Sequence, residues 1–195
     1  REHVSLEPTV GFDGGTPRRR QTVTAAVDRY LSQGLALPDL TVRIHDGNPG
    51  CEGLQGLFRA AGTVGVIDLC YPGEFLALHE LGHAWEHFNL DDDDRRRFQQ
   101  LTGSTSWRSA DIVWRERGCE LAANALAHGL LSAPLASAQF RERELALFTA
   151  LTGLTSPRLS ELQPTTTIAT SRILTADQME RLAAYDEWRR HSSAG

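Results

Sequence analysis

The sequence lacks the features that mark several large classes of protein. Its 20 basic and 25 acidic residues give a net charge of −5, so no excess of positive charge is available to neutralise phosphates. No apolar run approaches the roughly 20 residues that cross a bilayer, and the N-terminus lacks the charged-then-apolar pattern of a signal peptide. We therefore expect neither a nucleic-acid partner nor insertion into a membrane.

Cysteine is also scarce. The three cysteines have no CxxC spacing, which argues against a cysteine-based structural zinc site or a thioredoxin-type redox pair. Cys51 and Cys70 flank a segment with the pattern of a hairpin, so they are either a disulfide or two buried free thiols. A disulfide there would stabilise the fold by about 3 kcal/mol and favour an extracellular, oxidising compartment. Cys119 is the odd cysteine.

The composition is that of an ordinary globular protein, with 41% hydrophobic and 23% charged residues. A length of 195 residues fits a single domain with a sizeable core. We therefore assign residues 1–195 to one domain, with its core over about 38–131 and C-terminal helices at 139–190 packed on that core.

Hydrophobic periodicity predicts an α+β fold. The stretch up to about residue 17 is rich in glycine and proline and indicates a loop. Short alternating or apolar runs predict a small antiparallel sheet, and patterns of period 3.6 predict helices over most of the remainder. The expected strands span 40–44, 56–60 and 63–69, and the expected helices span 22–33, 74–88, 119–131, 139–151 and 176–190, with another starting near Asp91.

The most informative segment is His79-Glu80-Leu81-Gly82-His83, which matches the pattern HExxH within a predicted helix. Positions i and i+4 lie on one face of a helix, so His79 and His83 can bind one metal ion while Glu80 projects beside it. Zinc in such a site lowers the pKa of its bound water to about 7, and Glu80 would accept the proton as the water attacks a carbonyl. The alternative is two surface histidines and an acid on an amphipathic helix.

A tetrahedral catalytic site needs a third protein ligand. His87 continues the stripe of the motif histidines, but it lies about 12 Å along the helix axis from His79 and is too far to share one ion. Glu120 is the preferred ligand, because a carboxylate on an alanine-rich helix is costly to bury unless it is paired or bound to a metal. The alanines also allow this helix to approach the motif helix closely.

Three neighbours of Glu120 have different expected roles. Glu116 is the rival ligand, but it lies between two arginines, where a surface ion pair explains it. Cys119 would point about 100° away from Glu120 on the helix, so it is a weaker ligand candidate. Asn124, one turn after Glu120, can hydrogen-bond a histidine ligand and orient it from outside the coordination sphere.

This combination resembles the gluzincin family of zinc metallopeptidases, in which an HExxH helix is followed by a later helix with a glutamate ligand and an outer Asp or Asn. Glu120 and Asn124 match that later helix. The small size is similar to that of minigluzincins, and residues 51–131 resemble uncharacterised actinobacterial metallopeptidase-like proteins. The longer HExxHxxGxxH pattern of another class fails, because Glu86 occupies the glycine position and Asn89 the third-histidine position.

The resemblance implies a zincin-like domain with zinc as cofactor and a peptide or protein as substrate. In that family His79, His83 and Glu120 would be the metal ligands, Glu80 the general base and Asn124 the outer partner. The family more often has aspartate at the position of Asn124.

The resemblance also implies where substrate binds. The strand before the motif helix, residues 64–69, would pair with an extended peptide. Family members usually present a histidine or tyrosine to the oxyanion, and Tyr71 and His128 are the candidates here.

The sequence therefore predicts peptide-bond hydrolysis by a metal-activated water. One alternative is a catalytically weak or inactive zinc-bearing module that binds peptides or regulates a partner, although such a module would not need Glu80. Another alternative is a zinc ion that only joins two helices, but structural sites normally have four protein ligands and only three are evident. The sequence does not indicate an oligomeric state.

Overall fold

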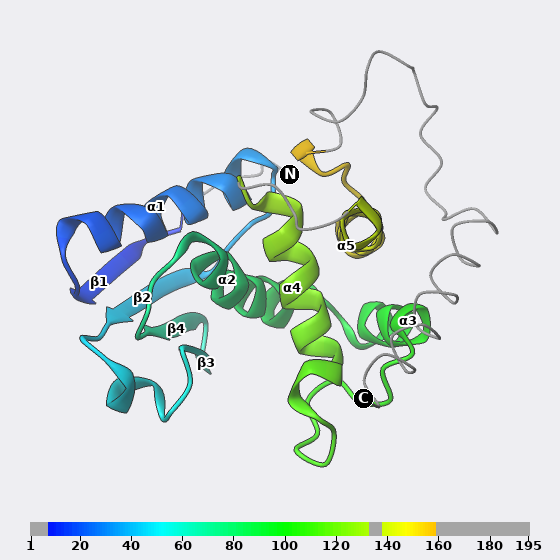
Figure 1. The fold of residues 1–195 in the computed structure, drawn as a ribbon, viewed down its shortest axis with the longest axis horizontal. Helices are drawn as coiled ribbons and strands as arrows, with labels where there is room; N and C mark the ends of the chain where they lie inside the picture. The colour runs from blue at the N-terminus through cyan, green and yellow to red at the C-terminus, as the bar shows by residue number, and fades with distance from the viewer. Residues whose placement is uncertain (1–7, 133–137, 159–195) are drawn as a thin grey trace.

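The computed structural model describes residues 8–132 and 138–158 of the chain (Figure 1). Its strands are β1 (Val10–Gly14), β2 (Asp39–Ile44), β3 (Gly56–Ala61) and β4 (Val64–Leu69). Its helices are α1 (Pro17–Ser32), α2 (Glu74–Asn89), α3 (Asp92–Thr102), α4 (Gly118–Leu130) and α5 (Ala138–Thr152), with the short 3-10 helices η1 (Asn48–Cys51) and η2 (Trp114–Glu116).

The four strands form one mixed sheet in the order β1-β2-β4-β3. β1, β2 and β4 run parallel, and β3 runs antiparallel to β4. The α+β class is confirmed. The expected antiparallel sheet is wrong, because the sheet is mixed and only the β3–β4 pair is antiparallel. Helix α1 connects β1 to β2 as the crossover that parallel neighbours require. β1 itself lies in a stretch whose glycines indicate a loop, so periodicity does not predict it.

Two helix starts follow from capping. α1 begins at Pro17 rather than residue 22, because the Thr16 side chain accepts a hydrogen bond from the backbone of Arg19, and proline suits the first helical position. α3 begins as expected after Asp91, which forms a reciprocal capping box with Asp94. Both starts are therefore local properties of the sequence.

One face of the sheet carries the main core. Leu40, Val42 and Ile44 alternate along β2 and are buried. Ile67 and Leu69 lie opposite Val42 and Ile44 in register and extend the same apolar surface. Helices α1 and α2 cover this surface, and each large side chain buried there contributes about 1.5–3 kcal/mol. Their buried apolar residues in this core include Val23, Ala26, Val27, Tyr30, Ala77, Leu78 and Leu81.

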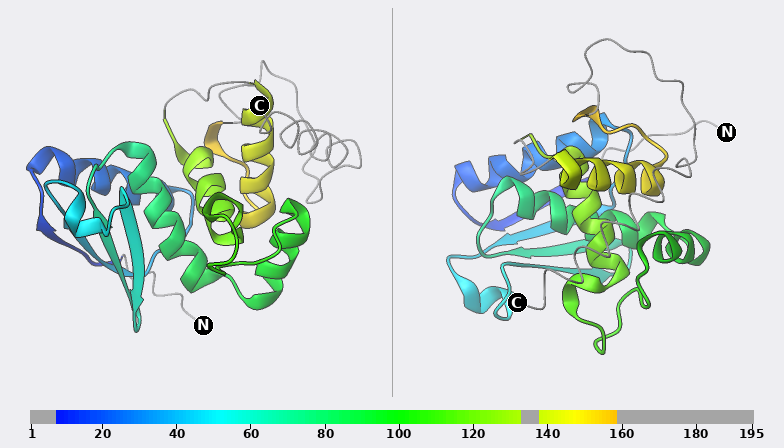
Figure 2. Two further views of the ribbon diagram at one scale, coloured as in Figure 1. Left: turned by 60° about the horizontal axis from the view of Figure 1, so that its bottom comes forward. Right: turned by 45° about the vertical axis from the view of Figure 1, so that its right-hand side comes forward.

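Helix α2 lies between two parts of the molecule. The sheet is on one side of it and α3, α4 and α5 are on the other, as both views show (Figures 1 and 2). Its most extensive helix packing is against α4. A smaller apolar cluster then joins α3, α4 and α5 through Phe98, Ala122, Ala125 and Leu147. The motif helix is therefore held from both sides.

The structure contains the disulfide between Cys51 and Cys70, whose Cα atoms are 6.1 Å apart. It connects the end of η1 to the residue after β4 and so encloses the edge strand β3. Cys119 is a buried free thiol. The helix expected at 176–190 lies outside the described residues. No described helix has the length and apolar character needed to cross a membrane.

Candidate metal centre

The motif residues occupy the buried middle of α2. The helix starts at Gly73, which has the extended backbone of an N-cap, and His79, Glu80 and His83 follow in its second and third turns. The two imidazole rings have centroids 4.8 Å apart and are nearly perpendicular. The one-turn spacing thus places both histidines on one face, as the sequence predicts.

Glu120 reaches this face from the first turn of α4. Its Oε2 atom lies 3.3 Å from His79 Nε2 and 3.4 Å from His83 Nε2. His79 and Glu120 are buried, and the His83 side chain is only 12% exposed. Among the described residues these three form the group of ligand atoms that could hold a metal ion, all within 4.8 Å of one another.

The close approach of α4 to α2 explains how Glu120 arrives there. A Cβ atom added at Gly82 would lie 2.9 Å from the Ala123 Cα atom and 3.2 Å from the Tyr30 hydroxyl. Backbone cannot move aside as a flexible side chain can, so glycine is needed between the two helices. The structure thus places Gly82 directly against α4.

The buried triad has the electrostatics of a cation site. Burial alone would raise the pKa of Glu120, but the facing imidazoles of His79 and His83 outweigh it and lower that pKa to about 2. Glu120 Oε2 is buried and forms no hydrogen bond of good geometry, despite the two imidazole nitrogens beside it. This carboxylate oxygen is therefore oriented toward a shared point rather than toward a single donor, which fits a metal ligand.

His79 has an outer partner on α4. Its Nδ1 atom lies 3.0 Å from Asn124 Oδ1. An amide oxygen only accepts hydrogen bonds, so Nδ1 carries a proton, and Nε2 is the ring nitrogen available to a metal ion on the side of Glu120. The structure thus brings Asn124 to the position expected from the sequence.

His83 has a different partner, Glu86, whose role the sequence does not predict. Glu86 is 0% exposed, and its Oε1 atom lies 3.8 Å from His83 Nδ1. Trp107 Nε1 donates to Glu86 Oε2 at 3.1 Å, and the Arg108 guanidinium donates to Oε1. The signal available in the sequence is a glutamate three residues after His83, on the buried face of the same helix.

The Glu80 side chain extends from α2 toward Gly56, the first residue of β3. A Cβ atom at Gly56 would come within 2.5 Å of Glu80 Oε1, so the strand passes directly against this carboxylate. Burial raises the pKa of Glu80, although the neighbouring His83 and His79 oppose that rise. A buried carboxylate with a raised pKa is suited to accept a proton near neutral pH.

The rival ligands lie elsewhere. Glu116 is exposed in η2, before α4 begins. Cys119 is buried with its pKa raised to about 12, mainly by burial, and it is outside the group that could hold a metal. The His87 ring packs near Phe58, with centroids 5.8 Å apart, and is also outside that group.

The oxyanion role stays a prediction for both candidates. Tyr71 is 57% exposed. His128 lies two turns along α4 from Glu120, which is about 12 Å of axial rise. Its ring packs against Phe75 with centroids 4.8 Å apart. The residue that would face an oxyanion stays unassigned.

The expected substrate strand is wrong. Residues 64–69 form β4, which is bonded to β2 on one side and to β3 on the other, so neither edge can accept a peptide. Within the described residues β1 and β3 are the edge strands, and β3 starts at Gly56 beside Glu80. The error arises because sequence order does not give strand order in a sheet.

An aromatic ring stands beside the triad on the side of η2. Trp114 is 49% exposed, and its ring centroid lies 6.1 Å from that of His79. Val113 next to it is 56% exposed. A large ring left half exposed next to a buried metal-ligand candidate gives a substrate side chain an apolar surface to cover.

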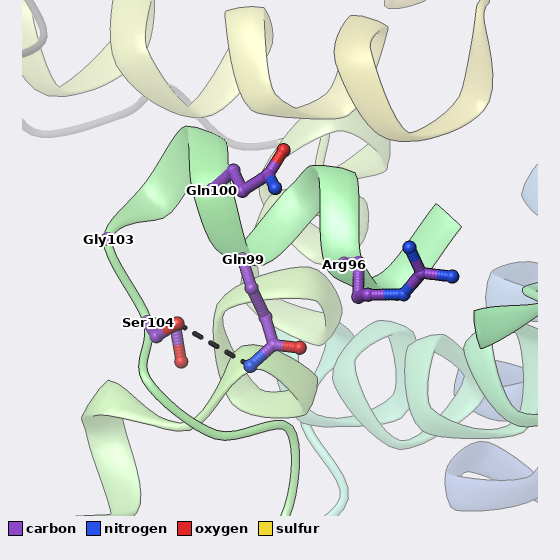
Figure 3. A pocket seen from close by; sticks show the side chains of 5 residues that line it. All are labelled: Arg96, Gln99, Gln100, Gly103 and Ser104. Atoms are coloured by element: carbon purple, nitrogen blue, oxygen red, sulfur yellow. Dashed lines mark hydrogen bonds between the residues drawn. The ribbon is translucent and has the colours of Figure 1, made fainter. Parts of the chain in front are cut away.

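A hollow elsewhere on the surface lies at the C-terminal end of α3 (Figure 3). Its lining residues are Arg96, Gln99, Gln100, Gly103 and Ser104. It contains no histidine, cysteine or carboxylate, so it offers neither the ligands nor the general base of a metal site. The triad is therefore the candidate functional site.

Comparison of the chain with protein-family models, curated proteins and solved structures found no match. The metal centre is therefore inferred from its side-chain geometry alone.

Proposed function

We propose that the chain is a gluzincin-type zinc peptidase, in which His79, His83 and Glu120 hold the metal and Glu80 is the general base. The observation that carries this proposal is the convergence of two Nε2 atoms on one buried carboxylate oxygen, at 3.3 and 3.4 Å. Ligand atoms about 2.0–2.1 Å from a tetrahedral ion lie roughly 3.3 Å from one another. The donor set and these two distances therefore fit zinc.

Two histidines and one glutamate leave one tetrahedral position for water or substrate, as in catalytic rather than structural zinc sites. Zinc there supplies Lewis acidity, which polarises a substrate carbonyl and lowers the pKa of water at the site. The protein contributes the outer contacts that orient the ligands, since Asn124 holds His79 and Glu86 faces His83.

Glu80 supplies the proton transfers. It takes a proton from the attacking water, and the same carboxylic acid then protonates the leaving amine. Burial raises its pKa, and within the described part of the chain it forms no ion pair that would keep it charged. Gly56 keeps the carboxylate free of a side chain on the β3 side.

A peptide substrate is supported by the edge of the sheet. No other strand of the described residues pairs with the outer side of β3, and an extended peptide can add there as a further strand. The strand begins at Gly56, so a peptide bound along it runs beside Glu80. Trp114 offers a substrate side chain an apolar surface next to His79. The Cys51–Cys70 disulfide fixes this edge strand and suits a secreted enzyme.

The decisive experiment compares the wild type with Glu80→Gln. We expect one zinc ion per chain in both proteins, because this substitution leaves all three ligands in place. Hydrolysis of a mixed peptide library, followed by mass spectrometry, should fall by about 10²–10⁴-fold in the variant, the usual contribution of a general base.

Two outcomes would contradict the peptidase. One is hydrolysis that persists after the zinc has been removed with a chelator. The other is a zinc-loaded wild type that binds peptides but does not cleave them, which would support a peptide-binding module instead.

A further inference from the structure

Glu86 is a glutamate in the interior of the protein that the proposed proton transfers do not use. Its side chain is 0% exposed, and burying a carboxylate costs several kcal/mol unless other groups compensate. Three groups surround it: Trp107 Nε1, the Arg108 guanidinium and His83 Nδ1. These contacts hold the Glu86 carboxylate in one position.

The His83 ring lies between two carboxylates. Its Nε2 atom faces Glu120 at 3.4 Å, and its Nδ1 atom faces Glu86 at 3.8 Å. The second separation is longer than a hydrogen bond, so Glu86 acts on the ring through its charge. A negative charge on that side favours the proton on Nδ1, which leaves the Nε2 lone pair for the metal.

We propose that Glu86 is a positioning residue of the metal centre, which fixes the orientation and tautomer of His83 and is itself held by Trp107 and Arg108. This inference rests on metal binding by the triad, as in the proposed function. Each of the two histidines then has an outer partner on the side of its Nδ1 atom. Asn124 serves His79 from α4, and Glu86 serves His83 from α2 itself.

The holding groups come from the segment between α3 and α4. Trp107 and Arg108 lie in it, and Trp114 beside His79 lies further along the same segment. Trp107 also packs against Phe98, with ring centroids 6.1 Å apart, which anchors it to α3. Glu86 therefore connects a metal ligand to the segment that forms one wall of the site.

Zinc affinity of the full chain tests the proposal directly. Glu86→Gln keeps the size of the side chain and removes its charge, and we expect zinc to bind 10–100-fold more weakly in competition with a chromophoric chelator, the usual effect of losing an outer partner. Glu74→Gln is the matched control. Glu74 is also on α2 and is ion-paired to Arg29, away from the triad, so its loss should change zinc affinity less than about twofold.

A spectroscopic readout separates positioning from general stability. In the zinc-loaded, 15N-histidine-labelled chain, we expect His83 to bind through Nε2 and to keep a slowly exchanging proton on Nδ1. That proton should shift upfield and exchange faster in Glu86→Gln but not in Glu74→Gln. If Glu86→Gln does not fold, Trp107→Phe removes one donor to Glu86 and should weaken zinc binding a few-fold.

Equal zinc affinity in Glu86→Gln and Glu74→Gln, or coordination of His83 through Nδ1 in the wild type, would overturn the proposal even if the enzyme is active. Zinc binding without hydrolysis would instead overturn the proposed function and leave the role of Glu86 supported by the affinity series. A wild type that does not bind zinc would overturn both.

Discussion

Two successive turns of α2 each contain a histidine and a buried glutamate, but the two glutamates have opposite surroundings. The His79–Glu80 turn leaves its glutamate buried against Gly56, with no hydrogen bond or ion pair within the described residues. The His83–Glu86 turn surrounds its glutamate with an indole N–H, a guanidinium and an imidazole. One helix thus provides both an uncompensated carboxylate and a compensated one.

The difference appears in the two pKa values. Burial raises the pKa of Glu80, because the opposing effect of His83 and His79 is smaller than that of the lost water. Burial acts in the same direction on Glu86, but the contacts with His83 and Arg108 outweigh it and lower the pKa. The proposed general base, Glu80, and the proposed positioning residue, Glu86, therefore have different surroundings on the same helix.

The largest expected effect comes from removing Glu120, the proposed ligand that both turns of α2 face. Glu120→Ala deletes the carboxylate that faces His79 and His83 together. We expect zinc affinity to fall by more than about a hundredfold, beyond the loss of an outer partner, because a direct ligand is removed. Chelator competition measures the effect, and activity at limiting zinc should fall with it.

Glu116→Ala is the matched control for this change. Glu116 is exposed in η2, four positions before Glu120, and we expect its loss to leave zinc affinity unchanged. Equal zinc affinity of Glu120→Ala and wild type would show that the third ligand is another residue.

Local sequence patterns predict much of this site. The i, i+4 spacing predicts that His79 and His83 share a face, and a lone carboxylate on an alanine-rich helix predicts a partner for Glu120. Both expectations depend on a helix period that neighbouring residues determine by themselves. The roles of these residues in binding zinc and in catalysis stay predictions.

Contacts between distant segments are harder to predict. β1 pairs with β2 across the whole of α1, and β4 lies inside the sheet although it directly precedes the motif helix. Glu86 depends on Trp107 and Arg108, about twenty positions further along the chain, and no local pattern connects these residues. Strand order and outer partners are therefore properties of the folded chain, which periodicity does not encode.

A smaller expected effect is on folding stability, which the substitutions of Glu86 and Glu80 should change in opposite directions. In the metal-free chain we expect Glu86→Gln to lower the free energy of unfolding at pH 7 by about 1.5–3 kcal/mol, the range for hydrogen bonds to a charged group. We expect Glu80→Gln to raise the melting temperature instead, because it replaces an ionised carboxylate that burial destabilises. Thermal unfolding followed by circular dichroism in the presence of a chelator measures both.

The contributions of Glu86 and Glu80 to folding stability depend on pH with opposite signs. Glu86 has a lowered pKa when folded, so its contribution is present above the unfolded value of about 4.3 and is lost as pH falls through the folded one. Glu80 has a raised pKa, so its penalty is present above the folded value and disappears as pH falls below about 4.3. Shifts of the same sign in both variants at pH 7 would contradict the difference between the two turns.

The smallest expected effect on zinc affinity comes from giving Asn124 the charge that Glu86 has. Asn124 is a neutral partner that accepts a hydrogen bond from His79, whereas Glu86 is a charged partner that faces His83 at 3.8 Å. Asn124→Asp keeps the acceptor oxygen and adds a charge, which makes the imidazole a more basic ligand, so we expect zinc affinity to rise a few-fold. Asn124→Ala removes the acceptor and should lower affinity by about tenfold. Chelator competition on both variants decides whether the charge or only the hydrogen bond matters, since equal affinities for Asn124→Asp and wild type would assign the role of Asn124 to orientation alone.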